Sequence, residues 1–364
     1  MNEIYLNRLE KARNEMKKEN LRALLVSDPY SVWYLSGIWN EPYERMYVLY
    51  IEETGKPKLF VNFLFNVPQS AKEDFDEFWF SDSDDYVSIL SKNTAAGGKI
   101  GVDKTWPAKF LIPLMKKKPD AEFVVGSECI DGLRAKKDEE EVKLMREASR
   151  INDICIEKGF GFIKPGVTEK EAADYIRELY KWEGAEGESF ETIVSFGANA
   201  ADPHHSPDGT VVKEGDCVLI DMGCRKNHYC SDMTRTAFFK SADEDSKKIH
   251  DIVRLANETA ESIVKPGIPL CDIDKAARDV IEKAGYGKYF THRLGHFIGQ
   301  TDHEAGDVSS ANKNLAQEGM IFSIEPGIYL PGKIGVRIED LILVTKNGAE
   351  VLNHVDKKWR IIGK

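Results

Sequence analysis

Four acidic residues lie inside apolar segments in the second half of the chain, and they constrain the fold more than any other feature. The segments are residues 217–223, 231–239, 321–327 and 336–344, which contain Asp221, Asp232, Glu325 and Glu339. Burying a lone ionised carboxylate costs several kcal/mol or more, so each of these side chains needs a cationic partner. The fold must bring either a metal ion or a basic side chain to each of them.

The spacing of these carboxylates predicts two hairpins. The pairs and the centres of their turns are Asp221 and Asp232 about Lys226-Asn227, and Glu325 and Glu339 about Gly332. In an unbulged hairpin, residues placed in this way face each other with Cβ atoms about 5 Å apart. Like charges this close repel strongly unless a cation lies between them. The alternative is that each carboxylate pairs with a buried basic side chain, for which Arg235 and Arg337 are available.

Histidines lie near these segments in the sequence. Gly295-His296 is followed by His303, and His204-His205 precedes Asp221. Four carboxylates and one imidazole form a mostly oxygen ligand set for two divalent ions. That set favours manganese, with cobalt, zinc and iron as alternatives. Two such ions can share and deprotonate a water, then stabilise the oxyanion formed when it attacks a carbonyl. The sequence has no G-x-S-x-G motif that would indicate a serine nucleophile.

The length of the chain, 364 residues, predicts two domains. Up to residue 126, short apolar segments alternate with helical ones, which is typical of an α/β domain, with strands expected near 24–26, 46–51, 59–63, 100–102 and 123–125. We place the domains at 1–128 and 129–364. In the second domain, Lys164-Pro165-Gly166 and Lys265-Pro266-Gly267 each open a helical stretch, which indicates two related halves about a pseudo-twofold axis.

Charge and composition exclude other classes of protein. The 50 Lys and Arg residues against 61 Asp and Glu give a net charge of -11, which argues against a nucleic-acid partner and against an anionic membrane surface. No apolar run reaches the roughly 20 residues of a membrane span. Residues 1–20 are charged throughout and predict a surface helix instead of a secretion signal. The six cysteines form no C-x-x-C pair, so we expect free thiols in a cytoplasmic protein.

Five short motifs follow one another in the second half of the chain. They are Leu219-Ile-Asp221-Met-Gly223, Ser231-Asp232-Met-Thr-Arg-Thr236, Gly295-His296, Ile324-Glu325-Pro-Gly327 and Arg337-Ile-Glu339-Asp340. With these motifs the chain resembles the pita-bread metallopeptidases, in particular the proline-specific branch of Xaa-Pro dipeptidases (prolidases) and aminopeptidase P. The resemblance covers nearly the whole chain. It implies an α/β two-domain fold, with a creatinase-like N-terminal domain followed by an α+β pita-bread catalytic domain.

The resemblance also implies an activity and a set of metal ligands. A hydroxide that bridges two divalent ions would hydrolyse the Xaa-Pro bond at the N-terminus of dipeptides or short proline-containing peptides. The ligands would be Asp221, Asp232, His296, Glu325 and Glu339, with Asp232 and Glu339 bridging both ions. Relatives commonly form homodimers, so the resemblance implies a homodimer here.

The remaining site residues are carried over from the same resemblance. His204 would stabilise the attacked carbonyl, and His303 would contact the substrate near the scissile bond. Glu325 would also move the proton to the leaving nitrogen, and Arg337 would orient ligands or substrate. Some dipeptidases hold the substrate's C-terminal carboxylate with an arginine, and residues 307–320 contain none. The missing arginine favours aminopeptidase P over the dipeptidase, and the length of the substrate stays open.

Two other functions are compatible with the same fold. A creatinase-like amidinohydrolase works without metal, and a non-catalytic binding module would bind a partner only. Both usually lack the full carboxylate set, which is intact in this chain, so we expect the metallopeptidase.

Overall fold

The computed structural model describes residues 3–363 and contains two compact units, one ending at Arg134 and the other beginning at Ala135. The boundary predicted from the sequence, residue 128, lies at the start of helix α5 (Glu128–Ala135). The predicted N-terminal helix is α1 (Glu3–Lys18), and the first two residues of the predicted range lie outside the described residues. Within residues 3–363, no helix has both the length and the apolar character that a membrane span requires.

The first unit is built on a six-stranded mixed sheet with the order β4-β3-β2-β1-β5-β6. Its strands are β1 (Ala23–Val26), β2 (Val48–Glu52), β3 (Lys58–Asn62), β4 (Asp76–Phe80), β5 (Gly98–Val102) and β6 (Ala121–Val125). Alternate residues of β1 face two different cores, because Leu24 and Val26 pack on one side while Ala23 and Leu25 pack on the other. Five of the strands lie at predicted positions. The edge strand β4 was not predicted, because it opens with two acidic residues.

Helices cover both faces of this sheet. They are α1, α2 (Pro29–Ser36), α3 (Tyr86–Lys92) and α4 (Ala108–Lys117). Residues of α1 and α2 belong to the core that contains Leu24, whereas residues of α3 and α4 belong to the core that contains Leu25. The α/β architecture predicted for the first domain is therefore confirmed.

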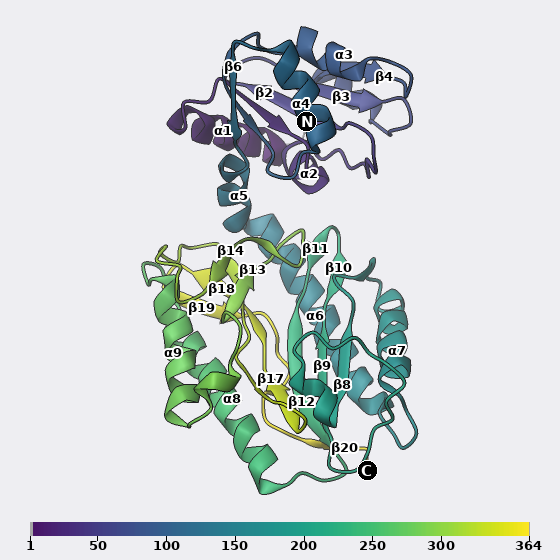
Figure 1. Ribbon diagram of the computed structural model, residues 1–364, viewed down its shortest axis with the longest axis vertical. Helices are drawn as coiled ribbons and strands as arrows, with labels where there is room; N and C mark the ends of the chain where they lie inside the picture. The colour runs from purple at the N-terminus through teal and green to yellow at the C-terminus, as the bar shows by residue number, and fades with distance from the viewer. Residues whose placement is uncertain (1–2, 364) are drawn as a thin grey trace. The chain divides into compact units, whose positions relative to one another are not determined.

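The second unit contains two similar arrangements of a helix pair and a mainly antiparallel sheet, and in the first sheet one short edge strand is parallel to its neighbour. The first has α6 (Glu139–Phe162), α7 (Glu169–Trp182) and a sheet of β8 (Ile193–Phe196), β9 (Cys217–Met222), β12 (Met233–Phe239) and β20 (Ile361–Ile362). The second has α8 (Glu244–Ser262), α9 (Leu270–Lys283) and a sheet of β13 (Gly295–Phe297), β14 (Glu304–Val308), β15 (Ile321–Ile324), β18 (Asp340–Thr345) and β19 (Gly348–Val351). The two helix pairs lie on opposite sides of the strands (Figure 1).

The predicted repeat appears in the turns that join each helix pair. Residues 164–166 connect α6 to α7, and residues 265–267 connect α8 to α9. Helices α6 and α7 each begin with a capping box, in which the N-cap side chain and a glutamate three residues later bond each other's backbone N–H groups. Each helix pair packs on its own hydrophobic core. The repeat is thus confirmed at the level of elements.

The register of the hairpin about Gly332 is as predicted. Strand β16 (Gly327–Leu330) pairs with β17 (Ile334–Arg337), and Gly327 lies opposite Arg337. Beyond Glu325 and Glu339, on the side away from the turn, Ile324 lies opposite Asp340 in the same register. Glu325 and Glu339 therefore face each other across the hairpin.

The predicted register of the other hairpin is wrong by two residues. Asp221 lies opposite Thr234, not Asp232. The turn is Asn227-His228, flanked by β10 (Cys224–Lys226) and β11 (Tyr229–Cys230). Both turn residues have positive φ, 48° and 68°, as a two-residue type I′ turn requires. A turn displaced by one residue shifts the pairing by two, so both carboxylates stay on one face but lie diagonally.

Candidate metal centre

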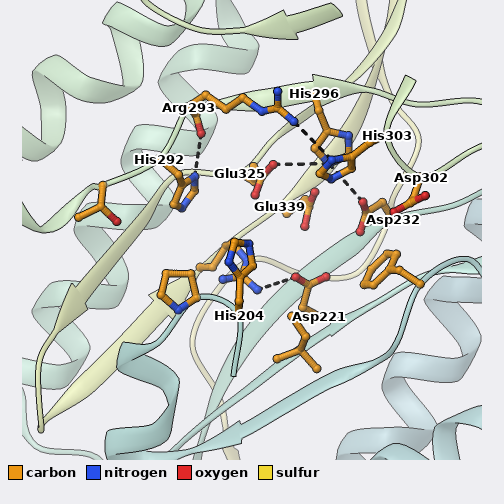
Figure 2. Close-up of a pocket in the computed structure, with 15 residues that line it drawn as sticks. His204, Asp221, Asp232, His292, Arg293, His296, Asp302, His303, Glu325 and Glu339 are labelled. Carbon is orange, nitrogen blue, oxygen red and sulfur yellow. Dashed lines mark hydrogen bonds and ion pairs between the residues drawn. The ribbon is translucent and has the colours of Figure 1, made fainter. Parts of the chain in front are cut away.

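All eight predicted site residues line one cavity of about 540 Å³ in the second unit. They are His204, Asp221, Asp232, His296, His303, Glu325, Arg337 and Glu339. Figure 2 shows the four carboxylates turned toward a common space, with His296 and His303 on one side of it and His204 on the opposite side. His204 and Glu339, the first and last of these residues, lie far apart in the sequence, and the fold brings them to the same cavity.

Three of the four carboxylates belong to residues that lie at breaks between strands. Only Asp221 lies within a strand, β9. Asp232 immediately precedes β12, Glu325 immediately follows β15, and Glu339 lies between β17 and β18. Three of the four apolar segments are therefore not continuous strands, because their strands are interrupted at Asp232, Glu325 and Glu339. The breaks free these residues from the regular ladder, and the Glu339 N–H instead donates to Thr234 O at 3.0 Å.

Short distances join the imidazole of His296 to the carboxylates. His296 Nε2 lies 3.5 Å from Asp232 Oδ2 and 3.5 Å from Glu325 Oε1. Asp232, His296 and Glu339 each offer one ligand atom, and these atoms all lie within 4.8 Å of one another. All three side chains are buried. This is the spacing at which several side chains can share an ion.

Burial and mutual repulsion disfavour the ionised form of these carboxylates in the protein alone. Burial, followed by the charges of Glu339 and Asp221, raises the pKa of Asp232 well above its usual value. Burial and the charge of Glu325 do the same to the pKa of Glu339. Burial raises the pKa of Glu325 to about 7, although Arg337 opposes the shift. For His296, burial lowers the pKa to about 3, so the imidazole is neutral and able to bind a metal.

The alternative partners are basic side chains, and they explain one carboxylate only. Arg337 donates to Asp221 Oδ2 at 2.5 Å, to Tyr329 Oη at 2.9 Å and to Thr234 Oγ1 at 3.0 Å. Burial alone would lower the pKa of Arg337. Neighbouring acidic groups, led by Tyr329 and Asp221, raise it by a larger amount, so the guanidinium stays charged. The other candidate, Arg235, pairs with Asp340 at 2.6 Å and contacts none of the four carboxylates.

Two unpartnered oxygens show that the site suits cations. Asp221 Oδ1 and Asp232 Oδ1 are buried, and neither has a hydrogen-bond partner among residues 3–363. Buried polar atoms normally have a partner, so this pair calls for one that the protein itself does not supply. Four carboxylates with one neutral imidazole provide the hard ligands that divalent ions prefer. The residues present therefore fit a divalent metal centre.

The cavity also contains residues that the sequence analysis did not predict for the site. They are Phe190, Ile193, Pro203, Thr291, His292, Arg293 and Asp302. Arg293 donates to His303 Nδ1 at 3.4 Å, and the rings of His303 and His296 are 3.8 Å apart. Arg293 lies only three residues before His296 in the sequence. That proximity to a predicted ligand is the signal in the sequence that indicates Arg293, which lies outside residues 307–320.

Comparisons with known proteins agree with this geometry. The model of metallopeptidase family M24 matches residues 143–346, and that of the creatinase/prolidase N-terminal domain matches residues 8–136. An uncharacterised peptidase of Staphylococcus haemolyticus is 40% identical, covering 97% of this chain and 100% of its own.

Two solved structures share the fold over nearly the whole length. The Xaa-Pro dipeptidase from Bacillus anthracis has a TM-score of 0.91 at 30% identity and covers 98% of this chain and 100% of its own. The X-Pro aminopeptidase from Thermotoga maritima has a TM-score of 0.86 at 29% identity and covers 97% and 99%.

Proposed function

Because this chain belongs to metallopeptidase family M24, we propose that it is an exopeptidase that removes an N-terminal residue preceding proline. The observation that carries the proposal is the convergence of all eight predicted site residues on one cavity whose carboxylates need cations. Two proteins of similar structure are an Xaa-Pro dipeptidase and an X-Pro aminopeptidase. This similarity supports Xaa-Pro peptides as the class of substrate.

The proposed metal ligands are the five residues Asp221, Asp232, His296, Glu325 and Glu339. When bound, two divalent ions supply Lewis-acid polarisation and lower the pKa of a water molecule. We propose manganese, because oxygen ligands predominate in the set. Arg337 keeps Asp221 oriented through Oδ2 and leaves Oδ1 directed at the cavity.

Protein groups would then handle the proton and the developing charge. Glu325 lines the cavity beside the other proposed ligands, where its carboxylate would take up a proton and deliver it to the leaving nitrogen. That nitrogen belongs to an imide without an N–H, so it must gain a proton to leave as an amine. His204 lies across the cavity from His296, where it can donate to the oxygen of the attacked carbonyl (Figure 2).

We propose a dipeptide as the preferred substrate, on account of Arg293. Arg293 lines the cavity and provides an arginine, which residues 307–320 lack. A guanidinium binds a carboxylate with paired, charge-assisted hydrogen bonds. A free carboxylate on proline would exist in a dipeptide and be absent from a longer peptide at that position.

The test is a paired assay on protein stripped of metal and reconstituted with manganese, with Ala-Pro and an Ala-Pro-Yaa peptide as substrates. Preferred cleavage of the dipeptide is expected, and preferred cleavage of the longer peptide would make the protein an aminopeptidase P. Inactivity on both peptides with metal bound would contradict the proposal. It would favour a non-catalytic binding module, while hydrolysis of creatine without metal would identify an amidinohydrolase.

We also propose that the enzyme is a cytoplasmic homodimer. All six cysteines are free thiols and five are buried, which suits a reducing compartment. The dimer is inferred from the family resemblance. Size-exclusion chromatography with light scattering will measure the oligomeric state, and a monomer would contradict this part of the proposal.

A further inference from the structure

A buried carboxylate outside the metal centre, Glu169, ties together the segment that carries His204. Glu169 is the first residue of α7, and its side chain is 0% exposed. Four N–H groups donate to it: Phe196 N (2.7 Å) and Asn199 Nδ2 (3.0 Å) to Oε1, and His205 Nε2 (2.8 Å) and Asp208 N (3.2 Å) to Oε2. A carboxylate only accepts, so His205 is the donor of its bond.

These contacts do not indicate a second metal site, although Glu169, His205 and Asp208 lie close enough to hold an ion. Both oxygens of Glu169 are already bonded to N–H groups, including two from the backbone. An ion would have to displace N–H donors that already satisfy both oxygens. The geometry instead describes a carboxylate that fixes a loop.

The four donors span the segment 196–208 from its first residue to its last, and His204 lies between them. The His204 backbone N–H donates to Asp202 Oδ1 at 3.0 Å, but its imidazole makes no hydrogen bond to any residue of 3–363. The place of the imidazole therefore depends on the backbone that carries it. The backbone of this segment depends in turn on Glu169, which none of the predicted roles uses.

We propose that Glu169 is a positioning residue that holds segment 196–208 so that His204 faces the substrate carbonyl. This inference rests on the proposed function for the role of His204. A displacement of about 1 Å at a reacting group can cost about 100-fold in rate, so a remote tether of this kind affects catalysis. A purely structural role is the alternative, because a carboxylate in the first turn also stabilises helix α7 through its dipole.

The experiment combines Glu169→Gln with His204→Ala. Glutamine keeps the size of the side chain, but its NH₂ group faces two of the N–H donors. Glu169→Gln should lower kcat/KM about 10- to 100-fold while the bound manganese is unchanged. In the His204→Ala background it should cause no further loss, because the residue through which it acts is gone. Independent, multiplied losses in the double variant would overturn the proposal.

Glu171→Gln is the matched control. Glu171 lies in the same first turn of α7, is exposed, and bonds Thr168 in the capping box without touching segment 196–208. It should retain the activity of the unmodified enzyme. A loss equal to that of Glu169→Gln would show that both act through the helix and would overturn the proposal.

Hydrogen exchange measured by mass spectrometry tests the same idea without activity. Glu169→Gln should speed exchange in peptides covering 196–208 and leave β9 and β12 unchanged. If Glu169→Gln does not fold, His205→Ala removes one of the four donors and should speed exchange in the same peptides. Unchanged exchange there would overturn the inference. Failure of the unmodified enzyme to cleave either peptide would instead contradict the proposed function, and the exchange result would still decide this inference.

Discussion

At the scale of single residues, Asp232 shows why the site requires a cation. It is buried, one of its oxygens has no partner within residues 3–363, and the charges of Glu339 and Asp221 raise its pKa. Asp232→Ala should abolish cleavage of Ala-Pro and lower the metal bound per protein, because the proposed bridging ligand is lost. Metal content by mass spectrometry is the measurement.

Glu140→Gln is the control for that variant, since Glu140 is exposed and pairs only with Lys143 on α6. It should bind metal and cleave Ala-Pro normally. Full activity in Asp232→Ala would contradict the dinuclear site.

A substitution at Arg293 tests whether the enzyme prefers a dipeptide or a longer peptide. Arg293→Gln removes the cation proposed for the C-terminal carboxylate, so it should raise KM for Ala-Pro about 10-fold or more and change KM for Ala-Pro-Yaa little. Steady-state kinetics on both peptides is the measurement. Lys288→Gln, at an exposed cation outside the cavity, should change neither constant. Equal effects of Arg293→Gln on both peptides would remove the reason for preferring a dipeptidase.

The site residues were predictable to different degrees for a physical reason. A carboxylate inside an apolar segment contradicts its surroundings, so Asp221 and its three counterparts are visible in the sequence. Arg293 lies in a polar loop, where a charged residue needs no explanation, and only its position in the cavity reveals it. Glu169 likewise resembles an ordinary first-turn helix residue until its four donors are seen.

At the scale of elements, the two hairpins show what fixes register. The turn at Gly332 contains a glycine with φ of 70°, so its centre can be located in the sequence. The other turn is Asn227-His228, and it contains no glycine. Asparagine adopts positive φ readily, but histidine at the second position is a weak turn signal. The pairing was therefore misplaced by two residues, which kept Asp221 and Asp232 on one face.

A further element-scale prediction concerns the contact between β17 and the 3-10 helix η2 (Gly197–Ala201), which precedes His204. A Cβ at Gly335 on β17 would lie 1.6 Å from Ala200 O, so the backbones of the two elements touch there. Gly335→Ala should destabilise the protein by about 1–3 kcal/mol and lower kcat/KM, because η2 must move. Urea unfolding and kinetics will measure both effects.

Gly348→Ala is the matched control for Gly335→Ala, since a Cβ at Gly348 meets nothing within 4 Å. It should change neither stability nor activity appreciably. A Gly335→Ala variant with normal stability would show that β17 and η2 can separate at no cost, and the account of this contact would be wrong.

At the scale of the whole molecule, the metal centre couples metal binding to stability and pH. Without metal, burial raises the pKa values of Asp232, Glu339 and Glu325, the last to about 7, so the folded protein favours the protonated form of these groups more than the unfolded chain does. Groups of this kind stabilise the fold at low pH and lose that effect as pH rises through the folded pKa. His296, with its pKa lowered to about 3, acts in the opposite direction, but only below about pH 6.5, where histidines of the unfolded chain become charged.

Above about pH 6.5 the histidine contribution is lost and the buried carboxyls dominate, including Glu261 outside the metal centre, whose pKa burial raises to about 7. The melting temperature of metal-stripped protein should fall by about 5 °C between about pH 6.5 and 8, whereas that of manganese-loaded protein should fall by less, because the ions favour the ionised carboxylates. Differential scanning fluorimetry at several pH values is the measurement. Glu325→Gln removes one titrating group and should make the metal-free profile less steep. A metal-free melting temperature that stays level or rises across this range would mean that the carboxylates already ionise without metal, and that the protein itself compensates their charge.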